Sequence, residues 1–284
     1  MSGTRISIWF ILAVAIALLW TFIPMYWTIK FAFMTKSEIS RFPPLLFPPE
    51  PNLASFYNIF GRDYTLPDGT VVPASGQARQ IVLGLRNSLI VSSVVTLVTI
   101  FVVTPLAYVF ARLEFPAKGK LLAAVLLSVS LPPVSTLIPF YVLYVQLDLV
   151  GTLGGLIIIT LTITIPIVAW VLIGFFRNMP PIEQLGRIDG FSRLYIFARI
   201  MVPMARSGIL VAAVIAFLFA WNEYVYAQVL VTGSNAVTLP AAMSGFLFQV
   251  PEPGHLAASL LISLLPPFLI AFFLQKHIAE MNFV

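Results

Sequence analysis

The composition of this chain excludes the soluble classes of protein. It has 284 residues, of which 60% are hydrophobic and 10% are charged, whereas a soluble domain carries about 25% charged residues. The sequence therefore indicates a polytopic membrane protein. Cysteine is absent, which excludes thiolate metal sites, and His255 and His277 are too few for a histidine metal cluster. The net charge of +5 fits basic cytoplasmic loops and gives no reason to expect nucleic-acid binding.

Six segments are long and apolar enough to cross a membrane as helices, which takes about 20 apolar residues. Five of them contain no charged residue, and one contains only Glu223. The first run is too long for the core of a signal peptide, so we expect it to be retained. We expect residues 1–284 to form one transmembrane domain with spans at approximately 6–29, 87–111, 121–146, 149–176, 207–231 and 256–274.

Basic residues set the predicted orientation. Lys and Arg gather between the second and third spans and in the loop 177–206, while the short loops after the third and fifth spans have none. Because basic loops stay in the cytoplasm, both termini are predicted to be cytoplasmic. The loop 30–86 is long and of mixed charge, and we place it outside. Its proline-rich start could lead into a short helix, and residues 61–77 predict turns and a small hairpin.

The loop 177–206 is too long for a simple connection, so we expect it to have structure of its own. Two prolines before Glu183 suit a helix start, and Gly190 permits a left-handed turn. A second short helix follows and is predicted to end before Pro203. Its apolar stripe is predicted to consist of Leu194, Phe197, Ile200 and Met201.

Two interpretations of this loop remain open on periodicity alone. The second helix could lie on the membrane interface, with Arg193 and Arg199 on lipid headgroups. Alternatively, the two short helices form a docking element that enters a groove on a cytoplasmic partner.

The loop and several other segments resemble one family of membrane proteins. GRIDGFSRLYIFARIMVP is similar to the signature loop of binding-protein-dependent ABC transporter permeases, in which Glu-Ala-Ala precedes a Gly and then Ile-x-x-Pro. The segments that resemble the carbohydrate-importer type are NSLIVS, PLAYVFARLEFPAKGK, LPPVSTLIPFYVLYVQLDLVGT and FAWNEY. One departure is that Gln184 stands where the family has Glu. Gln can only hydrogen-bond to a basic residue, and Glu183 could take that place.

The resemblance implies a fold, a location and partners. The fold is the all-α, type I importer permease fold, with six transmembrane helices and a coupling-helix loop at 177–206. The location is the cytoplasmic membrane of a bacterium or archaeon. The implied partners are a second, related permease subunit, a cytoplasmic ATPase dimer and an extracytoplasmic solute-binding protein. The residues implied to couple to the ATPase are Glu183, Gln184, Gly186, Arg187, Asp189, Gly190, Phe197, Ile200 and Pro203.

The chain lacks the motifs of an ATP-binding or catalytic protein. It has no G-x-x-x-x-G-K-[ST], so it cannot hold ATP phosphates by that loop. We therefore expect no cofactor on this chain, and ATP and Mg on the partner ATPase. No catalytic cluster is visible, so we expect a transport subunit rather than an enzyme.

The predicted solute pathway rests on Trp221, Asn222 and Glu223. An acid within a span is costly and normally faces water or a partner. Aromatic rings pack on sugar rings, while amides and carboxylates bind hydroxyl groups, so the three residues suit a polyhydroxylated solute. The alternative is that Glu223 only reaches headgroup water near the outer end of its span.

Prolines mark two of the spans. Pro132, Pro133, Pro139 and Pro166 are predicted to kink or break these helices, either for packing or to shape a central cavity.

Three alternatives to a sugar importer remain at this point. An importer of a phosphorylated polyol would call for Arg or Lys in the spans, and the predicted spans have none. A secondary transporter would call for several buried acids, and a membrane scaffold or enzyme for a catalytic cluster. The sequence therefore favours an importer of a neutral sugar or polyol.

Overall fold

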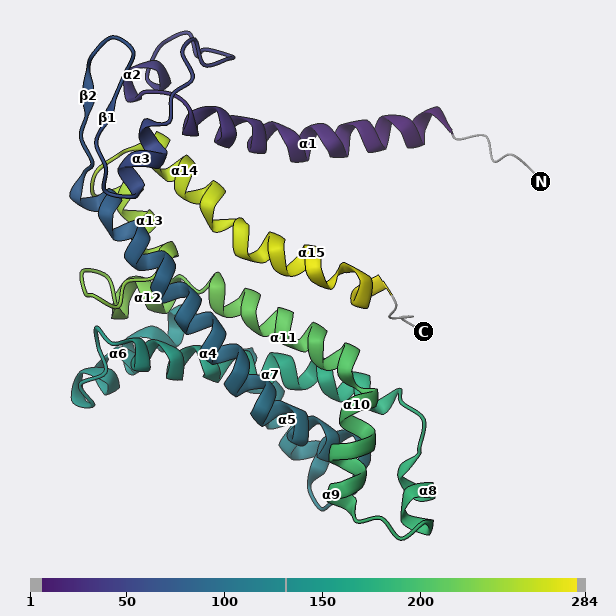
Figure 1. Ribbon diagram of the computed structural model, residues 1–284. Coiled ribbons are helices and arrows are strands. Elements are labelled where there is room, and N and C mark those ends of the chain that lie inside the picture. Colours follow the sequence, from purple (N-terminus) through teal and green to yellow (C-terminus); the bar gives the residue numbers. More distant parts are fainter. Residues whose placement is uncertain (1–6, 131, 280–284) are drawn as a thin grey trace. The chain divides into compact units, whose positions relative to one another are not determined.

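The computed structural model describes residues 7–130 and 132–279, and these form two compact units. One unit contains residues 7–82 with 242–265, and the other contains residues 83–241 with 266–279. Apart from one small hairpin, the regular structure in the described residues is helical (Figure 1). The prediction that the whole chain forms a single domain stays a prediction.

The described residues contain five helical segments that could cross a membrane, or six if one bent pair counts as a single span. The five are α1 (Ile8–Ala32), α4 (Gly76–Arg112), α7 (Leu153–Arg177), Arg206–Leu230 and Pro253–Gln275. The third predicted span is the bent pair, α5 (Lys118–Val129) and α6 (Pro133–Gln146), which meet at an angle above 40°. Pro132 has extended backbone and Pro133 begins α6, as expected of residues that cannot continue a helix.

The first unit joins α1 to the predicted outer loop. Its further elements are α2 (Lys36–Ile39), α3 (Ala54–Ile59), β1 (Tyr64–Thr65), β2 (Val71–Val72) and α14 (Pro253–Ser263). The two strands pair antiparallel, Tyr64 opposite Val72, so the predicted hairpin is confirmed, as is the short helix. Helix α14 packs against α1 and α3.

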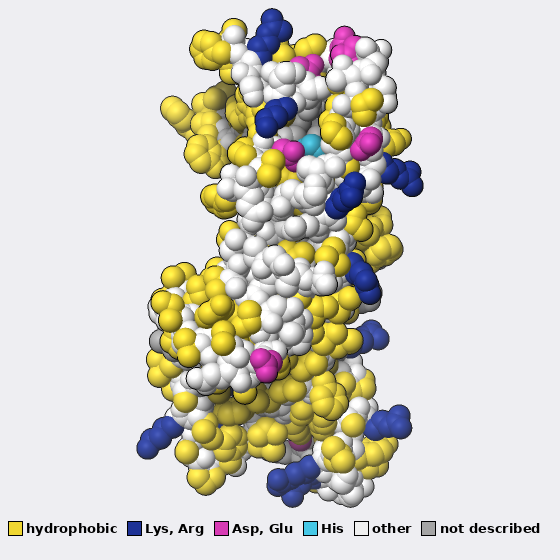
Figure 2. Space-filling view, turned by 90° about the vertical axis from the view of Figure 1, so that its left-hand side faces the viewer, with side chains coloured by type: hydrophobic (Ala, Val, Ile, Leu, Met, Phe, Trp, Pro, Cys, Tyr) yellow, Lys and Arg dark blue, Asp and Glu magenta, His cyan; other side chains and the backbone are white. Residues whose placement is uncertain are grey.

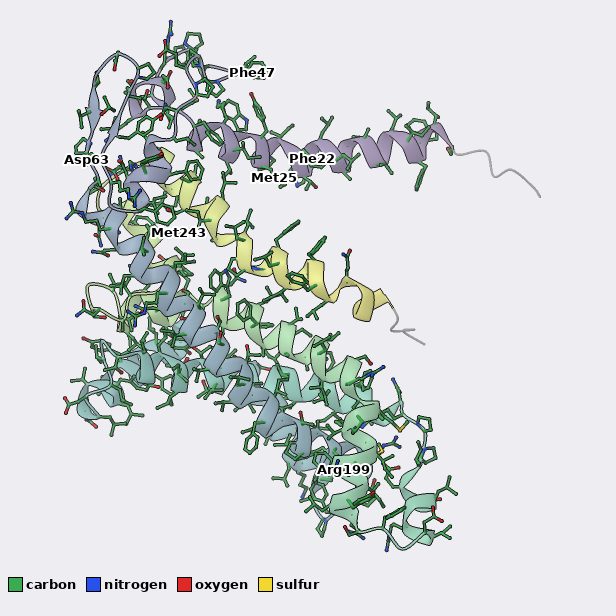
Figure 3. The ribbon with its side chains drawn as sticks, viewed as in Figure 1. Phe22, Met25, Phe47, Asp63, Arg199 and Met243 are labelled. Atoms are coloured by element: carbon green, nitrogen blue, oxygen red, sulfur yellow. The ribbon has the colours of Figure 1, made fainter. Side chains whose placement is uncertain are left out.

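Helix α1 is apolar all round and almost uncovered. Figure 3 shows Phe22 and Met25 standing out from it, with Phe22 59% exposed. Only its last turn is buried. There the Lys30 Nζ lies 3.2 Å from the centroid of the Trp27 ring and donates a 2.7 Å hydrogen bond to the Leu45 carbonyl.

In the second unit, α4, α7 and α11 (Arg206–Trp221) run side by side around one apolar core (Figure 1). Val103 and Ala107 of α4, Leu172 of α7 and Ala212 of α11 are fully buried in it. Small residues let α7 and α11 come close, since a Cβ at Gly208 would lie 2.5 Å from the Phe175 ring. The other helices of this unit include α12 (Val225–Leu230) and α15 (Leu265–Ala279), while α13 (Leu239–Phe248) begins in this unit and continues into the first.

The loop 177–206 folds at one end of this unit. It contains α8 (Glu183–Ile188), α9 (Arg193–Ile196), the π-helix η1 (Phe197–Met201) and α10 (Val202–Met204). On the face drawn in Figure 2, Lys and Arg side chains are present at this end as well as elsewhere on the face, and hydrophobic side chains predominate just above this end.

Candidate functional site

The loop 177–206 contains the turn at Gly190 between two short helices that the sequence predicts. We call α8, this turn and α9 together the elbow. Gly190 has φ +84°, a conformation that glycine adopts without strain. The amide of Gly190 donates to the Arg187 carbonyl (3.1 Å), and the amide of Phe191 donates to the Gly186 carbonyl (3.0 Å). Ser192 then caps α9 by accepting from the Tyr195 amide at 3.2 Å. The prediction of two short helices joined at Gly190 is confirmed.

The predicted apolar stripe on the second helix is partly wrong. Leu194 is 74% exposed, and Ile196 is buried in its place, together with Met201. Phe197 and Ile200 are partly buried against the same core. The inward residues Ile196, Phe197, Ile200 and Met201 are spaced i, i+1, i+4 and i+5, which is one face of a helix. Leu194, in the first turn of α9, lies at the edge of this face and is left exposed.

The prediction that this helix ends before Pro203 is also wrong. Pro203 lies inside α10, which continues directly from η1. A proline ring normally clashes with the carbonyl four residues before it. A π-helical turn changes that register, so the helix can continue past Pro203 with a bend.

The outer surface of the elbow is apolar. We call this surface the elbow patch. Its largest exposures are 81% at Ile188, 74% at Leu194 and 63% at Leu185, while the rings of Phe191 and Tyr195 stack with centroids 4.8 Å apart. The elbow patch consists of Leu185, Ile188, Phe191, Leu194 and Tyr195.

Polar residues surround the elbow patch. Gln184, Arg187 and Asp189 are exposed on α8 and at its end, and Arg199 is exposed on η1 (Figure 3). Gly186, by contrast, is buried, and a Cβ there would lie 3.1 Å from Ile196. The structure thus brings the predicted coupling residues together around one turn, but it buries Gly186 and partly buries Phe197 and Ile200 inside the chain.

Glu183 has a partner within the chain. Its Oε1 lies 3.2 Å from the Arg112 Nε, and the two side chains are 18% and 12% exposed. The N–H does not point in line at the carboxylate, so the contact is an ion pair rather than a directed hydrogen bond. Gln184 is therefore the exposed side chain at the position where the signature loop has Glu.

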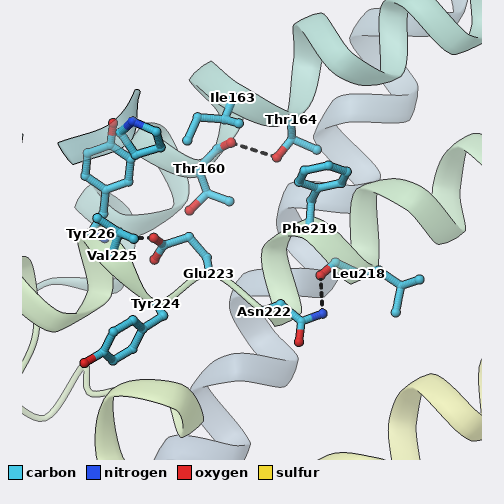
Figure 4. Close-up of a pocket in the computed structure, with 11 residues that line it drawn as sticks. Thr160, Ile163, Thr164, Leu218, Phe219, Asn222, Glu223, Tyr224, Val225 and Tyr226 are labelled. Atoms are coloured by element: carbon cyan, nitrogen blue, oxygen red, sulfur yellow. Dashed lines mark hydrogen bonds between the residues drawn. The ribbon is translucent and has the colours of Figure 1, made fainter. Parts of the chain in front are cut away.

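A second candidate site is an open pocket of about 480 Å³ in the same unit. It lies where α11 ends and α12 begins, next to α7. Figure 4 shows Glu223 and Thr160 directed into it from opposite sides. The pocket is lined by Pro133, Thr160, Ile163, Thr164, Leu218, Phe219, Asn222, Glu223, Tyr224, Val225 and Tyr226.

Two of the three predicted pathway residues line this pocket. The Glu223 carboxylate accepts from the amides of Tyr226 (2.8 Å) and Ala227 (3.0 Å), so it also caps the start of α12. The Asn222 side-chain amide donates to the Leu218 carbonyl at 2.8 Å (Figure 4). Trp221 is 3% exposed and stacks on Phe217, so it does not line the pocket.

The sequence interpretation missed the polar residues on the other wall. Thr160 and Thr164 are four residues apart on α7 and share a face, a signal that is present in ITLTIT. The Tyr226 hydroxyl lies 2.7 Å from the Thr136 hydroxyl and joins α12 to α6. Among the described residues, no Lys or Arg lines the pocket, and no group of three or more His, Asp or Glu is placed to hold a metal ion.

The apolar spans, the kinked helices and the charged loop at one end define a polytopic membrane transport subunit. Comparison with known proteins then identifies the family. Residues 88–280 match the family described as the binding-protein-dependent transport system inner membrane component, and the chain belongs to that family. It is therefore an ABC importer permease, a transport subunit of the inner membrane.

Relatives and a solved structure agree with this assignment. The trehalose transport system permease protein SugB of Mycobacterium tuberculosis is 31% identical over 75% of this chain and 83% of its own length. The trehalose/maltose transport system permease protein MalG of Thermococcus litoralis is 31% identical over 69% of this chain and 72% of its own length.

The fold itself matches that of a crystal structure of a bacterial ABC transporter involved in the import of the acidic polysaccharide alginate. The two chains have a TM-score of 0.76 and 13% sequence identity, over 96% of this chain and 94% of that one. The all-α fold class and the type I permease fold are confirmed.

Proposed function

We propose that this permease serves an ATP-driven importer of a sugar or sugar-like solute and couples to a cytoplasmic ATPase through residues 177–206. The observation that carries the proposal is the elbow patch. It is an apolar surface on a loop that carries five arginines, and Ile188 is 81% exposed on it. Apolar groups presented on a polar loop are typical of a protein–protein contact.

The interfacial-helix alternative fits the loop less well. A helix lying on a membrane buries one continuous apolar face. Here the inward face of η1 is already used by the core of the same chain, and the exposed apolar residues come from both sides of the Gly190 turn. A turn that presents side chains from two helices suits a cleft in a partner protein.

The proposed assembly follows from the family. We infer a second, related permease subunit, a cytoplasmic ATPase dimer that binds ATP and Mg, and an extracytoplasmic solute-binding protein. We place both termini in the cytoplasm because Lys and Arg are frequent between the second and third spans and in the loop 177–206. This chain binds no cofactor in the proposal.

The proposed solute is neutral and hydroxylated. Glu223, Asn222, Thr160 and Tyr226 supply oxygen and amide groups to the pocket, and Tyr224 and Phe219 supply rings. A phosphorylated solute would need a cation to neutralise it, and the described lining has none. The printed names of the relatives, trehalose and trehalose/maltose systems, support the same class.

Site-specific crosslinking tests the proposed coupling. The chain has no native Cys, so a photo-crosslinker attached at Ile188→Cys reports on one position. We expect it to capture the ATPase when the complete transporter is expressed. The matched control is Phe101→Cys, which is 82% exposed on α4 and should capture no ATPase. Absence of capture from position 188 in every nucleotide state would contradict the proposal.

A further inference from the structure

The C-terminal end of helix α4 contacts the loop 177–206 both before and after Gly190. The Tyr108 ring lies 5.0 Å from the Phe197 ring, on η1, and 5.9 Å from the Phe176 ring, at the end of α7. One turn further on, Arg112 pairs with Glu183 at the start of α8. The elbow is therefore attached to α4 by two side chains, although α4 is not its neighbour in the sequence.

Arg112 has three polar contacts with the loop 177–206, all before Gly190. Besides its 3.2 Å contact with Glu183, its guanidinium donates to the Pro180 carbonyl at 3.0 Å and to the Met179 carbonyl. The planar, multi-donor guanidinium suits this set of acceptors, and a lysine ammonium cannot reproduce it. Loss of Arg112 would leave the partly buried carboxylate of Glu183 without its counter-charge.

The segments that connect the elbow to α7 and α11 along the chain are irregular in structure. On one side the helix α7 ends and residues 178–182 follow without regular structure. On the other side the chain passes through the π-helix η1 and a break at Ala205 before α11 begins. Such irregular segments absorb changes of backbone angle. These segments can absorb part of a movement of the elbow, whereas the contacts of Tyr108 and Arg112 join the elbow to α4 directly.

The same helix is fastened at a second place in its unit. The Asn87 side chain donates to the carbonyls of Asn235 (2.9 Å) and Val237 (2.8 Å), and Ser88 accepts from the Leu239 amide (2.9 Å). A Cβ on Gly84 would lie 3.0 Å from the backbone of Leu239. Helix α4 is thus attached to segment 235–239 near Asn87 and to the elbow near Arg112.

We propose that α4 is a transmission rod between the coupling loop and segment 235–239, and that Arg112 and Asn87 are the positioning residues at its two attachments. Between them the helix continues for 25 residues, or about 37 Å at 1.5 Å per residue. Pro105 removes one backbone hydrogen bond, but the helix continues to Arg112. This inference rests on the proposed function, because the rod needs an ATPase at the elbow.

The test uses the complete transporter in proteoliposomes. Two quantities are measured, the copurification of the ATPase and the ratio of ATP hydrolysis with and without solute-loaded binding protein. We expect Arg112→Ala and Asn87→Ala each to lower this ratio about tenfold, within the usual range of allosteric coupling, with copurification unchanged. Arg112→Lys should restore part of the ratio, since it keeps the charge near Glu183. The matched control is Arg41→Ala, an exposed arginine outside both α4 and the loop 177–206, which should leave the ratio unchanged.

The double variant provides the sharpest outcome. Effects at sites this far apart normally add, so two independent defects would multiply to about a hundredfold loss. If both residues serve one rod, Arg112→Ala with Asn87→Ala should lower the ratio no further than either alone. Additive losses, an unchanged ratio, or a fall that only follows lost copurification would each overturn the inference. Failure of the wild-type complex to bind an ATPase would instead overturn the proposed function.

Discussion

Replacing Gly190 by Val tests whether the elbow geometry is required for coupling. The residue has φ +84°, and a Cβ there would meet nothing within 4 Å. Steric clash with neighbours is therefore absent, and the cost comes from the backbone alone. A left-handed conformation costs a residue other than glycine about 1–2 kcal/mol, with a β-branched side chain at the upper end. The turned form of the elbow should then become about 5–30 times less populated relative to other conformations.

The assay compares Gly190→Val with a matched glycine. Gly119 also has open space around its Cβ position, but it lies in α5 without a positive φ, so Gly119→Ala should be neutral or slightly stabilising. We expect Gly190→Val to weaken copurification of the ATPase and to lower solute-stimulated ATP hydrolysis. Gly190→Asn should be milder, because Asn tolerates this conformation better. If Gly190→Val behaves like Gly119→Ala in both measurements, the left-handed turn is not needed in the working complex.

Four further predictions follow from the structure. Glu223→Ala should reduce solute uptake without loss of the ATPase, because it removes an acceptor from the pocket and a cap worth about 0.5–2 kcal/mol from α12; unchanged uptake would support a mere contact with headgroup water. Gly208→Ala should destabilise the chain by about 1–3 kcal/mol in thermal unfolding, since its Cβ would lie 2.5 Å from the Phe175 ring, while Gly174→Ala in open space should not. Gln184→Glu should be tolerated or should tighten ATPase binding, as measured by copurification at low and high salt. A reporter that is active only in the cytoplasm should be active when fused after Val284, and a signal confined to the outside would refute the proposed orientation.

Local chemistry explains what the sequence predicted well. The elbow was predictable because Gly190, the prolines before Glu183 and the cap at Ser192 act within a few residues. The second span was predictable from its apolar run, but α4 begins at Gly76 rather than Asn87. The apolar run stops where Arg79 and Arg86 appear, whereas the helix continues because arginine is a good helix former.

Contacts between distant segments explain what was missed. The ion pair of Glu183 joins residues 71 positions apart in the chain, and no period in the sequence encodes it. The buried face of the second helix contains Ile196 and not Leu194, and the apolar pattern alone could not decide between these two residues. Trp221 was assigned to the pathway by its neighbours, but its position four residues after Phe217 places the two rings in a stack.

The burial of Lys30 has a consequence for how α1 sits in a bilayer. Most of this helix is exposed although α14 packs against it, and its buried residues lie in the last turn, where the Lys30 ammonium is held by the Leu45 carbonyl and the Trp27 ring. A cation fixed at the rim of the hydrocarbon region sets the depth of a helix, while bare apolar sides leave its tilt to whatever surrounds it. The last turn therefore fixes the depth of α1 in the bilayer. The tilt of the helix is free to change with its neighbours and with membrane thickness.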